Sequence, residues 1–184
     1  MIKQLAPIPL AILALAVLST ATSAQRPPQP TEAHKLLERE VGVWDAKVKS
    51  RMMPGAPPMM STAVETVEKL GDFWITSKFE GSFRRTPFTG VGHTGFDEES
   101  GEYVSTWIDS MAPNLLVTRG THDSATDTLT LTGEGKDWIE GGPKQIKMVL
   151  KFIDADHKRF EIHEKTEDYP EWHTSLEIDY TRRK

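Results

Sequence analysis

The sequence predicts an all-β fold, an antiparallel up-and-down β-barrel of about nine or ten strands that follows one short helix. The first observation is that apolar and polar residues alternate from Trp44 to the end of the chain, as in strands with one buried face. The second is that polar or Gly/Pro clusters separate the alternating segments, as at hairpin turns. Closure removes the exposed edges that so many antiparallel neighbours would leave in an open sheet. A two-sheet sandwich is the alternative.

Residues 1–24 have the pattern of a secretory signal peptide. Lys3 is their one charged residue, an apolar run from Leu10 to Leu18 follows, and small residues precede a cleavage position after Ala24. The run is shorter than the ~20 residues needed to span a bilayer, which disfavours a membrane anchor. We therefore expect an exported protein, periplasmic or extracellular, without an integral membrane segment after cleavage.

Composition limits the partners and the number of domains. The formal net charge is −5, and loss of Lys3 makes it more negative, so nucleic acid is not an expected partner. The chain contains no cysteine, which excludes disulfides and thiol chemistry. Residues 25–31 are a proline-rich linker. Residues 32–184 are long enough for a single barrel domain with one core.

A short helix is expected immediately before the sheet. Thr31 can cap its N-terminus, and Gly42 can end it. Between them, apolar residues fall at helical spacing, so one face of the helix must cover another part of the protein. These residues are Ala33, Leu36, Leu37 and Val41.

The strand candidates follow in order and are separated by turn chemistry. They are residues 44–49, 64–70, 73–79, 88–96, 103–109, 115–119, 129–131, 146–152 and 172–180. In the second candidate, residues 64–70, the alternating residues that we follow along one face are Val64, Thr66, Glu68 and Leu70. The clusters expected at hairpin ends are residues 97–101, 122–127, 141–143 and 154–156. Gly90, Gly92 and Gly95 can let a strand bend or let another group approach closely.

Several short motifs together resemble one family of bacterial proteins. They are His34-Lys-Leu-Leu37, Gly42-Val-Trp44, Met53-Pro-Gly55, Leu70-Gly-Asp-Phe-Trp74, Phe88-Thr-Gly-Val-Gly92, Gly95-Phe-Asp97, Tyr103 and Trp107-Ile-Asp-Ser110. From about His34 to Arg182 the chain resembles the family called domain of unknown function 1579. The resemblance implies a calycin-like barrel, similar in shape to lipocalins, fatty-acid-binding proteins and haem-binding nitrobindins, and it implies no activity. Asp72 and Phe73 stand where relatives often have Gly-Arg, so an anion-binding role for that basic position is not carried over.

The segment 103–109 carries the main functional hypothesis. Alternation places Tyr103, Trp107 and Asp109 on one face of a strand. If that face points into the barrel, a phenol, an indole and a carboxylate line a cavity, as in small-molecule sites. The alternative is that Trp107 fills the core and Asp109 caps the following turn.

Trp44, His93 and Arg119 complete the candidate ligand-binding set. His93 and Arg119 lie on other predicted strands and could meet Asp109 across the interior, since a buried charge needs a partner. A solvent-facing position is the alternative for Arg119, because arginine is seldom fully buried.

We predict neither a metal nor another cofactor. The six histidines form no recognised ligand motif. None of them aligns with the haem ligand that the nitrobindin resemblance would require. The segment 52–60 has four methionines that could bind Cu(I), but we favour a flexible apolar lid over one barrel mouth.

The expected function is the binding of a small apolar or amphipathic molecule, for carriage or sensing, by an exported monomer or weak homodimer. One alternative is an envelope structural or protein-interaction module with a filled barrel. Another is a hydrolase acting on a small ester, lactone or sugar, which would need Asp97 or Asp109 to meet a histidine. We do not expect an enzyme, because the sequence lacks a Gly-x-Ser-x-Gly elbow, a Ser-x-x-Lys motif and a phosphate loop.

Overall fold

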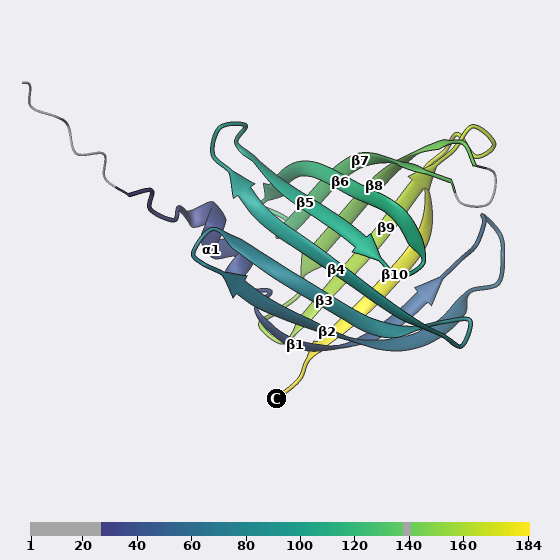
Figure 1. Cartoon of the computed structure of the whole chain (residues 1–184), viewed down its shortest axis with the longest axis horizontal. Coiled ribbons are helices and arrows are strands. Elements are labelled where there is room, and N and C mark those ends of the chain that lie inside the picture. Colours follow the sequence, from purple (N-terminus) through teal and green to yellow (C-terminus); the bar gives the residue numbers. More distant parts are fainter. Residues whose placement is uncertain (1–26, 138–140) are drawn as a thin grey trace, which may run out of the picture.

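Ten antiparallel strands close into a barrel in a computed structural model that describes residues 27–137 and 141–184 (Figure 1). Consecutive strands are neighbours around the ring, and β1 pairs with β10 to close it. The expected antiparallel up-and-down barrel is therefore confirmed, and the sandwich alternative is wrong. The signal-peptide prediction for residues 1–24 lies outside the described residues.

One helix and ten strands make up the described part of the chain. They are α1 (Glu32–Glu38), β1 (Gly42–Ser50), β2 (Met59–Leu70), β3 (Trp74–Phe83), β4 (Thr86–Asp97), β5 (Glu102–Asp109), β6 (Ala112–Asp123), β7 (Thr128–Lys136), β8 (Pro143–Phe152), β9 (His157–Lys165) and β10 (His173–Arg182).

Alternation along the strands separates an apolar interior from an outer surface, as the sequence predicts. On β1, for example, Trp44, Ala46 and Val48 are buried. On β2 the buried set is Ala63, Glu65 and Val67. The alternating set that we followed on this strand, Val64, Thr66, Glu68 and Leu70, is therefore the outer one. Valine and threonine suit either face of a pleated strand, so their presence at alternate positions did not identify the buried face.

Helix α1 covers one end of the barrel, at the left of Figure 1. Leu37 is buried, and the His34 ring lies 5.1 Å from that of Phe73 and 5.7 Å from that of Phe96. The Tyr103 hydroxyl donates a hydrogen bond to the Ala33 carbonyl oxygen at 2.9 Å. The helix thus caps this end, although it stops at Glu38, before the expected limit at Gly42.

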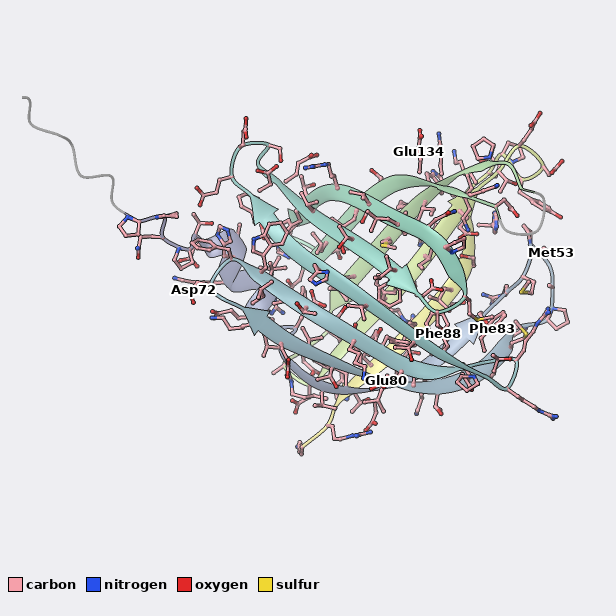
Figure 2. The ribbon with its side chains drawn as sticks, in the orientation of Figure 1. Met53, Asp72, Glu80, Phe83, Phe88 and Glu134 are labelled. Atoms are coloured by element: carbon pink, nitrogen blue, oxygen red, sulfur yellow. The ribbon has the colours of Figure 1, made fainter. Side chains whose placement is uncertain are left out.

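The opposite end of the barrel forms its mouth. The connection between β1 and β2 lies there, with Met53 at the right of Figure 2, while Asp72 marks the capped end at the left. Met53 is exposed, and so is Met60, which is already part of β2. No helix in the described ranges is long and apolar enough to cross a membrane.

Candidate functional site

The interior of the barrel is hollow. A cavity of about 880 Å³ extends from the mouth toward the capped end. Its wall is mainly apolar and is built from all sides of the ring, by residues such as Val48, Ile75, Leu131, Met148, Phe160 and Ile178. Leu115 also lines the cavity and is 62% exposed, so the space reaches the surface at the mouth. Its volume is within the range of small-molecule pockets.

Trp107 and Asp109 line this cavity, as expected for one face of β5. The Trp107 indole Nε1 donates to Asp109 Oδ2 at 3.1 Å, and the Met111 amide donates to Asp109 Oδ1 at 2.8 Å. Asp109 therefore both faces the cavity and holds the turn that follows β5. The indole is fixed by a charge-assisted hydrogen bond, which restricts its rotation.

Two glycines on β4 make room for Trp107. A Cβ atom on Gly90 would lie 2.0 Å from Trp107 Cζ2, and one on Gly92 would lie 3.2 Å from Trp107 Cε3. The strands pair so that Gly92 lies opposite Trp107. The alternate glycines thus serve the close approach of another group, one of the two roles expected for them.

Trp44 and Tyr103 face the interior but lie at the capped end, outside the wall of the cavity. Trp44 is 1% exposed, and its Nε1 donates to the Glu40 carbonyl oxygen at 2.7 Å. The Tyr103 hydroxyl donates its hydrogen bond to the Ala33 carbonyl oxygen. Both side chains therefore hold the α1 segment against the barrel.

His93 and Arg119 lie on the outer surface, so the expectation that they meet Asp109 in the interior is wrong. On β4 the residues on either side of His93, Gly92 and Thr94, line the cavity, and strand alternation turns His93 outward. The Arg119 side chain is 50% exposed and lies 3.4 Å from Asp97. The solvent-facing alternative for Arg119 is the one observed.

The contact that we required for a hydrolase, between a histidine and either Asp97 or Asp109, does not occur in the part of the chain that the structure describes. Asp97 bonds to Ser100 and Arg119, whereas Asp109 bonds to Trp107 and the Met111 amide. Neither carboxylate has a histidine partner among these residues.

The described histidines lie outside the cavity wall, so none is placed to ligate a haem there. No group of three or more potential metal ligands occurs in residues 27–137 and 141–184.

A buried ionic cluster forms the floor of the cavity and was missed by the sequence analysis. Lys158 Nζ on β9 lies 3.2 Å from Glu40 Oε2 and 3.0 Å from Glu65 Oε2. The rings of Trp44 and Tyr180 lie 4.6 and 4.7 Å from the same ammonium. We call Glu40, Glu65, Lys158 and Tyr180 the floor cluster; all four line the cavity.

Burial and mutual charge shift the titration of the floor cluster. Burial, helped by the charge of Glu65, raises the pKa of Glu40 although Lys158 acts against the shift. Burial opposes protonation of Lys158, but the two carboxylates keep its pKa above the ordinary value. Burial and the same two carboxylates hold the pKa of the Tyr180 phenol well above its usual value. The phenol therefore stays neutral, and Lys158 stays charged at neutral pH.

A signal for this cluster was present in the sequence. Glu65 lies in phase with Ala63 and Val67, and Lys158 lies in phase with Phe160 and Ile162. A charged residue in phase with the apolar face of a strand indicates a buried ion that needs a partner.

Hydroxyl groups add a polar patch to the wall formed by β3, β4 and β5. Ser77, Thr94 and Ser105 line the cavity, and Thr94 Oγ1 lies 2.9 Å from Ser105 Oγ. Phe83 and Phe88 lie toward the mouth end of the barrel (Figure 2). Both line the cavity, whereas none of the four methionines of segment 52–60 does. That segment therefore lies at the mouth end of the barrel without contributing a methionine to the cavity wall.

Comparison with known proteins identifies the fold and the family. The structure is similar to Rv2717c from M. tuberculosis, with a TM-score of 0.63 at 13% identity over 85% of this chain and 100% of the other. It is also similar to the S-type phycobiliprotein lyase CPES from Guillardia theta, with a TM-score of 0.56 at 15% identity over 85% and 99%. Both likenesses show the calycin-like fold alone, and no curated protein matches the chain. A family model covers residues 29–182, and the chain belongs to the family described as Protein of unknown function (DUF1579).

Proposed function

We propose that this protein binds a small apolar or amphipathic molecule inside its barrel and serves carriage or sensing rather than turnover. The observation that carries the proposal is the cavity of about 880 Å³ with its mainly apolar wall and accessible mouth. A barrel that served only as a structural module would gain stability from filling this space, because empty apolar cavities cost free energy. Trp107, Asp109 and the hydroxyl patch are the wall groups that would orient the ligand.

We further propose that the protein acts after export, as a monomer or weak homodimer. The signal-peptide pattern of residues 1–24 supports export. Tagging the chain at its C-terminus and fractionating the cells tests this part. We expect the tag in the periplasm or medium, with the mass of a chain that begins at Gln25, whereas cytoplasmic protein of full length would contradict export.

A pair of matched variants tests the binding function. Ser77 lines the cavity, whereas its neighbour Thr76 is on the outer face of the same strand. We expect Ser77→Trp to fill the cavity and weaken binding of a neutral, polarity-sensitive dye such as N-phenyl-1-naphthylamine by about tenfold or more, a loss of about 1.4 kcal/mol. Thr76→Trp should bind like the wild type. Equal fluorescence titrations for all three proteins would contradict a binding site in the barrel.

A further inference from the structure

We propose that the floor of the cavity receives a positively charged hydrogen-bond donor, so that the preferred ligands are amphipathic amines or protonated nitrogen heterocycles. This inference rests on the proposed function, because it requires that a ligand enter the cavity. It adds the chemistry of the ligand and its orientation, with the apolar body along the wall and the cationic end at the floor.

The balance of charges in the floor cluster favours the binding of a cation. Two carboxylates, from Glu40 and Glu65, surround the single ammonium of Lys158 at 3.2 and 3.0 Å. When both carboxylates are ionised, the floor has one unit of negative charge in excess. An unpaired charge away from bulk water is costly, so the floor is stabilised by either a proton or a cationic ligand. The raised pKa of Glu40 reflects the first of these options.

The exposure of the three side chains shows which atoms a ligand would meet. The Lys158 side chain is 1% exposed and is covered by the Trp44 and Tyr180 rings. The side chains of Glu40 and Glu65 are 12% and 11% exposed. Lys158 contacts Oε2 of Glu40, and no other described residue hydrogen-bonds that carboxylate's Oε1. The cavity therefore ends in carboxylate oxygens, with the cation behind them.

These contacts also disfavour the opposite class of ligand. A fatty acid would bring a third carboxylate toward Glu40 and Glu65. The cation at the floor, Lys158, already pairs with both of these glutamates. Like charges at close range in a dry site oppose binding, whereas an ammonium would supply the missing positive charge. The floor thus discriminates by charge, and the apolar wall accepts the hydrocarbon part of either ligand.

Three probes with the same hydrocarbon chain test the inference. Dodecylammonium, dodecanol and dodecanoate are titrated calorimetrically at neutral pH, below the concentrations at which they aggregate. We expect dodecylammonium to bind about tenfold or more tightly than dodecanoate, with dodecanol between them. Ser77→Trp, which fills the cavity, should weaken all three and so shows that they bind inside.

Two charge-removing variants locate the source of the preference. Glu40→Gln leaves Lys158 and Glu65 as a matched pair and removes the excess negative charge. Glu164→Gln removes a carboxylate that also lines the cavity, where its partner is Lys144 at 2.6 Å near the mouth. We expect Glu40→Gln to reduce the preference for the ammonium probe by about tenfold and Glu164→Gln to retain it.

Each outcome of these titrations either supports or overturns the inference. A preference for the ammonium that disappears in Glu40→Gln and persists in Glu164→Gln supports it. Equal binding of the three probes, tighter binding of dodecanoate, or a preference that survives Glu40→Gln overturns the inference and leaves the binding function standing. Absence of binding by all three probes to the wild type overturns the inference and the proposed function together.

Discussion

Trp107 occupies the space that side chains on β4 would need. Its ring atom Cζ2 lies 2.0 Å from where a Gly90 Cβ would be. We expect Gly90→Ala to displace the indole from Asp109 and to lower the free energy of unfolding by about 1–3 kcal/mol, the usual cost of overpacking. Denaturant unfolding and tryptophan fluorescence measure the two effects. The control is Gly142→Ala, since nothing lies within 4 Å of that added methyl group; equal effects of both variants would contradict the close approach.

Glu40 couples the stability of the floor to pH. Its pKa is raised above the ordinary value of 4.5, so the folded state binds the proton more tightly than the unfolded state. The stability from this proton is fully present below 4.5 and is lost as the pH rises through the folded-state pKa. Glu40→Gln removes that loss, whereas Glu65, Lys158 and Tyr180, the titratable groups that face Glu40, remain in both proteins.

We therefore expect the stability of Glu40→Gln relative to the wild type to increase as the pH rises above 4.5. Urea unfolding of both proteins at a series of pH values measures this difference. A difference that stays constant across the series would show that Glu40 titrates normally in the folded state.

Strand periodicity identified some residues of the site and misplaced others. The period of two correctly placed Trp107 and Asp109 on one face of β5. It does not give the depth of a residue along the barrel, so it could not separate Trp107 from Tyr103, which lies under α1. The same period, applied to β4, would have turned His93 outward once Gly92 was assigned to the interior. Glu65 was missed because on β2 we followed only the alternating set of Val64, Thr66, Glu68 and Leu70, which is the outer one.

At the scale of elements, α1 is attached to the barrel by exposed ion pairs as well as by Leu37. Arg39, just after the helix, makes two hydrogen bonds of 2.8 Å to Asp127 in the β6–β7 turn. Lys69 on β2 lies 2.6 Å from Glu38. The Arg39 guanidinium is the main cause of the lowered pKa of Asp127, with His122 contributing. The stability contributed by the ion pair between Asp127 and Arg39 is therefore present above pH 3.8, the ordinary pKa of an aspartate. It is lost as the pH falls through the lower pKa that Asp127 has in the folded state.

Removing the charge of Asp127 should loosen the helix with little effect on the barrel. Asp127 has a φ of 53°, a conformation that asparagine tolerates. We expect Asp127→Asn to speed hydrogen exchange in residues 32–38, while global stability falls by about 1 kcal/mol or less, as for exposed ion pairs. Asp179→Asn is the control, because it breaks the exposed pair with Arg159 on the barrel wall. Faster exchange of the helix in both variants, or in neither, would contradict the role of Asp127.

The sequence located most element boundaries through their turn residues, and the exceptions have local causes. The strand expected at 115–119 begins at Ala112, because the β5–β6 turn is tight and the pairing shifts between Trp107 and Asp109. Pro113 therefore lies within a strand, where a turn was expected from its composition. Strand β9 was not delimited in advance, because two of its inward positions are the charged residues Lys158 and Glu164, which leaves only Phe160 and Ile162 as alternating apolar residues.

For the whole molecule, alternation and turn spacing predicted the closed barrel, but they could not show whether it was filled. That property depends on the sizes of side chains that meet from opposite walls. Small inward residues such as Ala63, Ser77, Gly92 and Ser105 lie on the neighbouring strands β2 to β5 and leave room in the interior for the cavity of about 880 Å³. The pairing of β1 with β10 closes this space laterally, and α1 caps one end. Access is therefore concentrated at the mouth.

Native mass spectrometry of the protein purified from the cells that make it tests the central claim most directly. The claim is that the barrel holds a small molecule, so the wild type should carry an additional mass of a few hundred daltons, as expected for a ligand that fits this cavity. Thr76→Trp should carry the same mass, and Ser77→Trp should lack it. A wild type that is consistently free of additional mass, or a mass that persists in Ser77→Trp, would contradict the claim.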